Sequence, residues 1–301
     1  MPTLTRPEGT RPQDLNLSRR GLAGAVFGGY AVYALSADAQ PITTDAVGLV
    51  TETVQFPVED RFIPAFLARP DARGRFPTVI VISEVFGVHE YIRDVCRRLA
   101  KLGYVALAPD FFVRAGDPSG ISDFNEIRRI VSQSSEAQVN GDLRGALAYL
   151  KGQRFSDSRK LAICGFCWGG AVAWLACEQM SEFKAGAAWY GRLTPPKPGD
   201  FLGEPDRNWP LQRAAALKAP VLGLYGGKDQ GIPLSDVELM RQALAASGKS
   251  RSELVVFPNA QHGFHADYRA SYDAAAAADG WARMLAHFAR NGVAPKAYKP
   301  G

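Results

Sequence analysis

The sequence predicts a doubly wound α/β protein, in which helices cover both faces of a mostly parallel sheet. Apolar, β-branched runs such as residues 78–83 are typical of strands that are buried on both faces. These runs alternate along the chain with segments of helical period, which is the pattern of parallel α/β sheets. The chain has 301 residues, of which 47% are hydrophobic and 22% charged, as expected for a folded globular protein.

The elements follow in a regular order. Two extended segments joined by a turn-like Pro-Val-Glu-Asp-Arg stretch come first and predict an antiparallel hairpin. Right-handed crossovers between the later strands leave few topologies. We expect the hairpin at 49–56 and 62–68, strands at 78–83, 104–108, 160–164, 185–190, 221–225 and 254–257, and helices at 89–102, 140–151, 168–180, 234–246 and 272–290.

The first 39 residues have the composition of an export leader. Arg19-Arg20 precede a run without charge from 22 to 35, and Ala37-Asp-Ala39 has the small-x-small form that signal peptidases cut. Such a run is too short to cross about 30 Å of hydrocarbon. The segment resembles the twin-arginine export signal of bacteria, with an ordinary Sec signal or an uncleaved anchor as alternatives. We expect a periplasmic or secreted protein without a stable membrane anchor after cleavage.

The rest of the chain predicts a single domain. We expect a leader at 1–39, a linker at 40–47, the folded domain at 48–290 and a polar, frayed tail at 291–301, with a surface excursion at 192–208 near the site. The net charge of +5 comes from scattered residues without a Lys/Arg stripe, which argues against nucleic-acid binding. Four cysteines are too few for a disulfide scaffold. A monomer acting on a small molecule is expected.

The turn after residues 160–164 has the pattern of a nucleophile elbow. Gly165-Phe-Cys167-Trp-Gly169 is a G-x-nucleophile-x-G sequence with cysteine in the nucleophile position. A sharp turn from strand to helix strains its middle residue, and glycines two residues before and after leave the necessary space. The turn also places the sulfur at a helix N-terminus, which favours a thiolate. The alternatives are an inert buried cysteine and a redox pair formed with Cys164.

A base and an orienting carboxylate follow at later strand ends. His262 comes after the strand at 254–257, and Asp229 comes after the strand at 221–225. The order Cys167, Asp229, His262 is the nucleophile, acid, histidine order of the α/β-hydrolase fold, so we predict that fold and this catalytic triad.

The other histidines have weaker claims to a role. His265 is expected to support the site or to bind substrate, and His287, in the last predicted helix, is expected at the surface. A metal site built on the His-x-x-His pair is the weaker alternative, because no cluster of further ligands accompanies it. We therefore expect no metal site.

Six motifs together resemble the dienelactone hydrolase family, the carboxymethylenebutenolidases. They are Ile82-Ser-Glu-Val-Phe-Gly-Val88, Pro109-Asp-Phe-Phe-Val-Arg114, Gly165-Phe-Cys-Trp-Gly-Gly170, Trp189-Tyr-Gly-Arg192, Gly227-Lys-Asp229 and Ala260-Gln-His-Gly-Phe264. The resemblance spans roughly residues 50–290 and implies hydrolysis of an ester or lactone through a cysteine acyl-enzyme, without a cofactor. A broader carboxylesterase or thioesterase and a non-catalytic binding or stress protein are the alternatives.

The resemblance also implies roles for further residues. Glu84 matches a glutamate that contacts the resting cysteine, and the backbone N–H groups of Val85 and Trp168 would form the oxyanion hole. Arg114 matches an arginine that binds the substrate carboxylate, and Tyr190 is expected beside the substrate. Independently of the family, a carboxylate at the end of a buried strand needs a partner, and a thiol or an arginine is expected beside Glu84.

One position departs from the family pattern. The dienelactone enzymes carry a second arginine four residues after the catalytic histidine, and this chain has Ala266 there, between His265 and Asp267. Arg269 is close but out of register. This departure predicts an ester or lactone less anionic than dienelactone itself.

Overall fold

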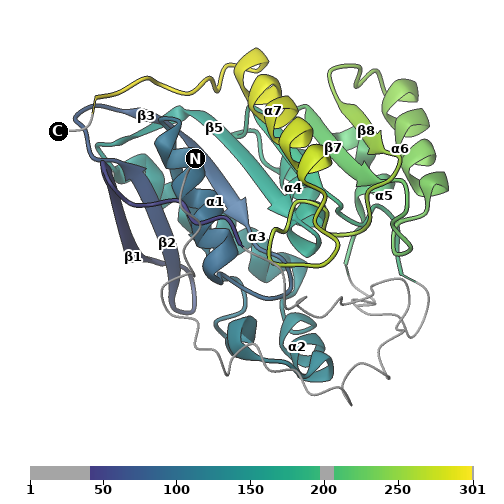
Figure 1. Ribbon diagram of the computed structural model, residues 1–301, viewed down its shortest axis with the longest axis horizontal. Helices are drawn as coiled ribbons and strands as arrows, with labels where there is room; N and C mark the ends of the chain where they lie inside the picture. The colour runs from purple at the N-terminus through teal and green to yellow at the C-terminus, as the bar shows by residue number, and fades with distance from the viewer. Residues whose placement is uncertain (1–40, 197–206, 300–301) are drawn as a thin grey trace.

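One eight-stranded sheet forms the centre of the molecule (Figure 1). The computed structural model describes residues 41–196 and 207–299. The predicted leader and most of the predicted excursion at 192–208 therefore lie outside the described residues. The strand order is β1-β2-β4-β3-β5-β6-β7-β8. β1 with β2 and β2 with β4 are antiparallel, and every other neighbouring pair is parallel.

The predicted doubly wound sheet and its N-terminal hairpin are confirmed. Seven residues of the third strand are all buried, as their continuous apolar sequence predicts. The strands are β1 (Leu49–Pro57), β2 (Phe62–Pro70), β3 (Phe76–Ile82), β4 (Val105–Pro109), β5 (Ser156–Phe166), β6 (Ala185–Trp189), β7 (Val221–Gly226) and β8 (Glu253–Phe257).

Helices cover both faces of the sheet. α1 and α7 lie on the side facing the viewer in Figure 1, and α3 and α4 lie behind the sheet. α4 is buried almost all round, consistent with its apolar sequence and with its contacts to β5 and β6. The helices are α1 (Glu90–Lys101), α2 (Phe124–Val131), α3 (Glu136–Gly152), α4 (Trp168–Gln179), α5 (Pro210–Arg213), α6 (Leu234–Ala246) and α7 (Ala274–Arg290).

The short helix α2 was not among the predicted elements. It begins after Asp123, whose side chain accepts a hydrogen bond from the backbone N–H of Asn125, and it buries only Ile127, Ile130 and Val131. The helix has only eight residues, fewer than the roughly 11–18 over which a helical period is recognised, and this explains why the sequence pattern did not reveal it.

The segment predicted as a linker is docked on the domain. The backbone N–H of Thr44 donates to the Asp94 carboxylate of α1 at 2.5 Å. Lys101, the last residue of α1, donates hydrogen bonds to Asp45 at 2.5 Å and to the Val47 carbonyl at 2.7 Å. The described residues before β1 therefore form a strap along α1 rather than a free connection.

The prediction of a frayed tail is wrong. The yellow C-terminal segment in Figure 1 runs back over the sheet toward the β1–β3 side. Val293 is fully buried, Lys296 donates its N–H to the Gly103 carbonyl at 3.3 Å, and the Tyr298 ring meets the edge of Phe76 at 6.0 Å. A count of polar residues missed these contacts because the few apolar residues of the tail carry its packing.

Candidate active site

Cys167 occupies the strained turn between β5 and α4. Its φ of 55° and ψ of −112° are sterically unfavourable for an L-residue, and its N–H donates to the Trp189 carbonyl at 3.0 Å. The glycines beside it leave no room for a side chain. A Cβ on Gly165 would lie 1.9 Å from the Gly169 carbonyl oxygen, and one on Gly169 would lie 2.5 Å from the carbonyl oxygen of Ile82. Both predicted glycine roles follow from this packing.

His262 joins Cys167 to Asp229, so the structure brings the three predicted residues together. The Nδ1–H of His262 donates to Oδ2 of Asp229 at 2.7 Å, and the same imidazole interacts with the Cys167 side chain. The other carboxylate oxygen of Asp229 accepts the N–H groups of Gly231 at 2.8 Å and Ile232 at 3.2 Å. The carboxylate is thus fixed by the turn after β7, and it fixes the imidazole in turn.

The charges around His262 favour its protonated form. Burial alone would lower the pKa of the imidazole, but Asp229 and Cys167 outweigh it and raise that pKa to about 10. All three side chains are at least nine-tenths buried, so water screens their interaction weakly. The His262 imidazole is therefore protonated at neutral pH, with Asp229 and the Cys167 side chain beside it.

The predicted oxyanion donors lie at the start of α4 and after β3. Trp168 is the first residue of α4, where backbone N–H groups have no partner in the preceding turn. Val85 is 3% exposed and lies in the turn that follows β3, the strand next to β5. The helix terminus supplies donors near the sulfur, as an oxyanion site requires.

Glu84 is fully buried and has an arginine partner, one of the two partners that its burial predicted. Arg269 lies 3.2 Å from Oε1, and the Tyr268 hydroxyl donates to Oε2 at 2.5 Å. His89 lies 3.8 Å from Oε2. Burial would raise the pKa of Glu84, but Arg269 and these neighbours lower it to about 2. The carboxylate is therefore ionised and faces Arg269, while Cys167 faces His262.

The structure brings the Arg269 guanidinium near Cys167, the candidate nucleophile. It is 7% exposed, it interacts electrostatically with Cys167, and its Nε donates to the Tyr268 hydroxyl at 3.2 Å. Its guanidinium also lies 5.0 Å from the centre of the Phe86 ring. The family position four residues after the histidine is the buried Ala266, so the cation arrives from three residues further on.

Arg114 is held by two carboxylates. It makes paired hydrogen bonds to Asp60, at 2.7 and 2.6 Å, and to Asp142, at 2.8 and 2.9 Å. These contacts join the β1–β2 turn to α3. Because four donor contacts of the guanidinium are already made, we do not retain the predicted substrate-binding role of Arg114.

His265 lies in an aromatic cage rather than at an open position. Its ring is 4.4 Å from that of Trp189 and stacks on Trp281 at 5.5 Å, and its Nδ1 lies 2.6 Å from the Tyr91 hydroxyl. Burial and the nearby Arg98 lower its pKa to about 3, so the ring is neutral at physiological pH. Because the rings of Trp189 and Trp281 and the Tyr91 hydroxyl surround the imidazole, its place favours a packing role.

His287 corrects a smaller expectation. It is 1% exposed, and its Nε2 lies 3.2 Å from the Pro220 carbonyl. The helix α7 turns this histidine toward the sheet, whereas the sequence alone had placed it at the surface.

Tyr190 shares the backbone strain of the nucleophile. Its φ is 39°, and Cys167 and Tyr190 are the non-glycine residues with positive φ in the described part of the chain. The ring packs edge-on against His262 at 5.1 Å. The side chain is fully buried, so it shapes the wall behind the imidazole; whether it contacts substrate stays a prediction.

Cys164 differs from Cys167 in every respect that matters for chemistry. It lies within β5, is fully buried, and has a pKa raised by that burial. The four cysteines are all free. A strand position without a helix N-terminus does not match a redox pair, in which both sulfurs lie at the start of a helix.

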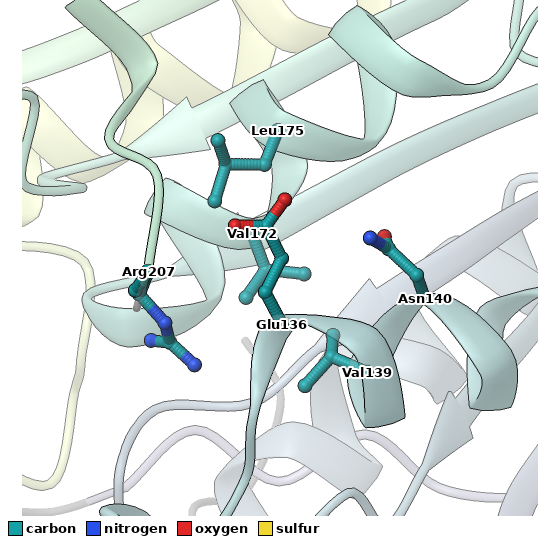
Figure 2. A pocket seen from close by; sticks show the side chains of 6 residues that line it. All are labelled: Glu136, Val139, Asn140, Val172, Leu175 and Arg207. Carbon is teal, nitrogen blue, oxygen red and sulfur yellow. The ribbon is translucent and has the colours of Figure 1, made fainter. Parts of the chain in front are cut away.

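A small hollow lies beside the triad's helix rather than at the triad. Figure 2 shows side chains from α3 and α4 around it, together with Arg207, whose guanidinium also lies 5.6 Å from the Trp168 ring centre. Its lining residues are Glu136, Val139, Asn140, Val172, Leu175 and Arg207. None of them belongs to the predicted site.

The described residues offer neither a metal site nor a helix that could span a membrane. No group of three or more His, Cys, Asp or Glu side chains among them could hold a metal ion. Within the same ranges, none of the helices combines the length and the apolar character that crossing a membrane requires.

The chain belongs to the dienelactone hydrolase family. The family model described as "Dienelactone hydrolase family" matches residues 63–292, which include every residue of the candidate triad. The fold and the elbow define a member of the α/β-hydrolases, and the family match places it among the dienelactone hydrolases within that class.

Relatives of known name agree. A Methylorubrum extorquens protein named "Putative carboxymethylenebutenolidase" is 48% identical over 92% of this chain and 94% of its own length. An Escherichia coli protein of the same name is 43% identical over 83% of this chain and 91% of its own. A crystal structure titled as a putative dienelactone hydrolase from Klebsiella pneumoniae has 45% sequence identity and a TM-score of 0.75, covering 80% of this chain and 99% of that one.

Sequence reasoning did not assign three residues that surround Glu84. His89 is part of the segment after the Glu-Val-Phe-Gly motif, and Tyr268 and Arg269 follow His262 by six and seven residues. The one signal available was the demand of the buried Glu84 for a cation, which pointed to an arginine without saying which one.

Proposed function

We propose that the protein hydrolyses an ester or lactone of the carboxymethylenebutenolide type, with Cys167 as nucleophile. The observation that carries the proposal is the geometry of Cys167 itself. A cysteine with a φ of 55° at a helix N-terminus, beside a histidine that bonds a buried carboxylate at 2.7 Å, has the components of a nucleophilic triad.

The chemistry proceeds in two steps. The thiolate of Cys167 attacks the carbonyl carbon, and the N–H groups of Val85 and Trp168 stabilise the resulting oxyanion. The bond from carbon to the ring or ester oxygen then breaks, and Nε2–H of His262 gives its proton to the departing oxygen. In the second step His262 takes a proton from water, the hydroxide attacks the thioester, and the carbon–sulfur bond breaks to release the acid and the thiolate.

The neighbourhood of Glu84 supports a substrate that carries an anionic group. Arg269 interacts with both Glu84 and Cys167, so a carboxylate on the substrate would find its guanidinium within reach of the sulfur. Arg269 thus takes the role that was predicted for Arg114, and it lies three residues beyond Ala266, where the family's second arginine is absent. A Bradyrhizobium relative is 32% identical over 73% of this chain and 86% of its own length. It is named "Probable 2-oxo-3-(5-oxofuran-2-ylidene)propanoate lactonase", and the propanoate in that name is a carboxylate.

Matched cysteine variants test the proposal. We expect the protein comprising residues 40–301 to hydrolyse cis-dienelactone or a related acidic lactone, and Cys167→Ala to abolish this, because removing the nucleophile of a triad costs roughly a million-fold in rate. Cys164→Ala is the control, since Cys164 is buried in a strand and should leave most activity. Hydrolysis is measured by the loss of lactone absorbance, and iodoacetamide should inactivate the wild type.

Other outcomes have defined meanings. Turnover of neutral esters alone would indicate a broader carboxylesterase or thioesterase. Retention of activity in Cys167→Ala with loss in Cys164→Ala would contradict the triad and favour the redox pair. A reactive thiol without turnover of any ester in the panel would favour a binding role.

We also propose export to the periplasm through the twin-arginine route. Support comes from Arg19-Arg20 and the uncharged run that follows, both of which lie outside the described residues. The proposal concerns where the protein acts and is independent of its chemistry.

A further inference from the structure

The loop of residues 263–272 delivers Tyr268 and Arg269 to Glu84. An ion pair connects that loop to α1, beside the contact between the Tyr91 hydroxyl and Nδ1 of His265 at 2.6 Å. The Arg98 guanidinium donates from Nη2 to Oδ2 of Asp267 at 2.5 Å. The Asp267 side chain is 1% exposed. The carboxylate end of the link is therefore buried, one residue before Tyr268, whereas the Arg98 side chain is 17% exposed.

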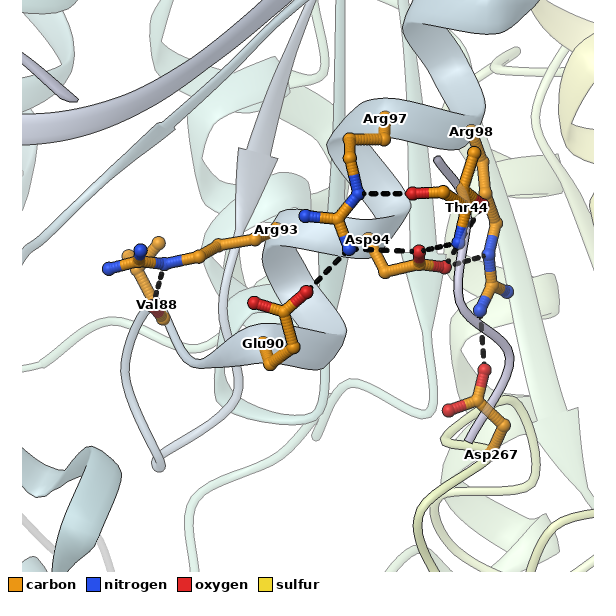
Figure 3. Close-up of polar contacts among 8 residues, drawn as sticks. All are labelled: Thr44, Val88, Glu90, Arg93, Asp94, Arg97, Arg98 and Asp267. Carbon is orange, nitrogen blue, oxygen red and sulfur yellow. Dashed lines mark hydrogen bonds and ion pairs between the residues drawn. The ribbon is translucent and has the colours of Figure 1, made fainter. Parts of the chain in front are cut away.

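Arg98 bonds a second buried carboxylate at the same time. Its Nε donates to Oδ2 of Asp94 at 2.5 Å, four residues earlier on α1. Asp94 in turn accepts the backbone N–H of Thr44 at 2.5 Å and Nη2 of Arg97 at 3.0 Å. Figure 3 shows the resulting series, from the N-terminal strap through Asp94 and Arg98 to Asp267.

We propose that Arg98 is a positioning residue of the active site, which holds the loop of residues 263–272 so that Arg269 and Tyr268 face Glu84. Arg98 has no part in the chemistry. It acts by fixing the backbone next to the residues that neutralise Glu84. The inference rests on the proposed function, because Glu84 and Arg269 matter only if Cys167 is the reacting group.

The physical reason is the cost of an unpaired buried charge. Without Arg98, the carboxylate of Asp267 would lose its partner in a buried position, and the loop would have to move to reach water. Arg269 would move with it, and Glu84 would lose its principal cation. A displacement of about 1 Å at a catalytic group can cost roughly a hundredfold in rate.

Arg97 provides a matched control. It lies next to Arg98 on the same helix and binds the same Asp94, but its other contacts are Glu90 and the Thr44 carbonyl at 2.7 Å. None of these contacts is with the loop. Replacing it removes one positive charge and part of the strap's anchoring while leaving the link to Asp267 in place.

The experiment compares Arg98→Gln, Asp267→Asn, Arg97→Gln and, as reference, Arg269→Gln. Hydrogen exchange of the peptide covering residues 263–272 reports the position of the loop directly. The rates of Cys167 alkylation by iodoacetate and by iodoacetamide report the charge beside the sulfur without requiring turnover. Arg98→Lys serves as a milder variant, because one ammonium cannot bridge both carboxylates as a guanidinium does.

We expect Arg98→Gln and Asp267→Asn to accelerate exchange of the loop, and to lower the iodoacetate-to-iodoacetamide ratio in the same direction as Arg269→Gln, because the Glu84 carboxylate is left without its cation. kcat/KM should fall about ten- to a hundredfold, with Arg98→Lys in between. Arg97→Gln should change the alkylation ratio and kcat/KM less than about twofold, even if it lowers the Tm as much as Arg98→Gln does.

Equal effects of Arg97→Gln and Arg98→Gln on exchange and on the alkylation ratio would overturn the inference, since both would then act only through stability. An unchanged ratio in Arg98→Gln and Arg98→Lys would overturn it as well. If Cys167→Ala kept hydrolytic activity, the proposed function would fail instead. The exchange comparison would still decide whether Arg98 holds the loop.

Discussion

At the scale of single residues, strain and burial converge on one spot. Cys167 and Tyr190 both have positive φ. The His262 ring interacts with both side chains: its centre is 5.1 Å from that of the Tyr190 ring, and it contacts the Cys167 sulfur. Strained backbone persists only where the surrounding packing enforces it. Here the carbonyl of Trp189, which accepts the Cys167 N–H, and the carbonyl of Leu224, which accepts the Tyr190 N–H at 2.7 Å, provide that enforcement.

In the proposed triad, Asp229 should set the pH range of catalysis. Because it is the principal cause of the raised pKa of His262, about 10, the imidazolium should persist to that pH and be lost above it. We expect kcat/KM to decline above about pH 10 in the wild type, since the departing oxygen then lacks its proton donor. In Asp229→Asn the decline should move to lower pH and the rate should fall roughly 10³- to 10⁴-fold.

The measurement is kcat/KM as a function of pH for both proteins, with alkaline stability checked by circular dichroism. The free energy of unfolding should depend on pH in the same direction. Because the pKa of His262 is raised, it adds stability that is complete below about pH 6.5 and is lost as the pH rises through about 10. An alkaline limb at the same pH in both proteins would show that another group governs it.

At the scale of elements, the junction of β5 and α4 depends on two glycines. Gly165→Ala should destabilise the protein by about 3 kcal/mol, because the new Cβ would lie 1.9 Å from a backbone oxygen that cannot give way. Gly141→Ala is the matched control. Gly141 lies inside α3 with open space around it, so alanine should stabilise by up to about 1 kcal/mol. Urea denaturation measures both, and similar losses would contradict the packing argument.

The elements themselves were accessible from local pattern. The predicted helix at 234–246 coincides with α6, and that at 89–102 differs from α1 by one residue at each end. These segments carry their own periodicity. The Arg98–Asp267 link spans 169 residues and leaves no local trace, so the loop that supports Glu84 could not be foreseen. The candidate triad could be predicted, because the turn glycines mark Cys167 and the ends of two strands mark Asp229 and His262.

At the scale of the whole molecule, the proposed export leader can be tested separately from the folded domain. Replacing Arg19-Arg20 by a lysine pair should retain the precursor in the cytoplasm, because the twin-arginine route reads the arginine pair itself. The control replaces Arg6 and Arg11, which lie in the same leader outside the motif, and should leave export unchanged. Fractionation of cells followed by immunodetection measures both, and export of the lysine pair at the normal rate would point to the Sec route.

The docked tail also has a consequence for the order of assembly. Lys296 and Tyr298 close over Gly103 and Phe76, which precede them by roughly 190 and 220 residues. A ribosome that adds about 5–20 residues per second needs on the order of ten to forty seconds to make that length of chain. During that interval the Phe76 ring lacks its contact with Tyr298, even if β3 has already paired with its neighbouring strands. Closure of this part of the surface therefore waits until residues 296–298 have been made and have left the ribosome.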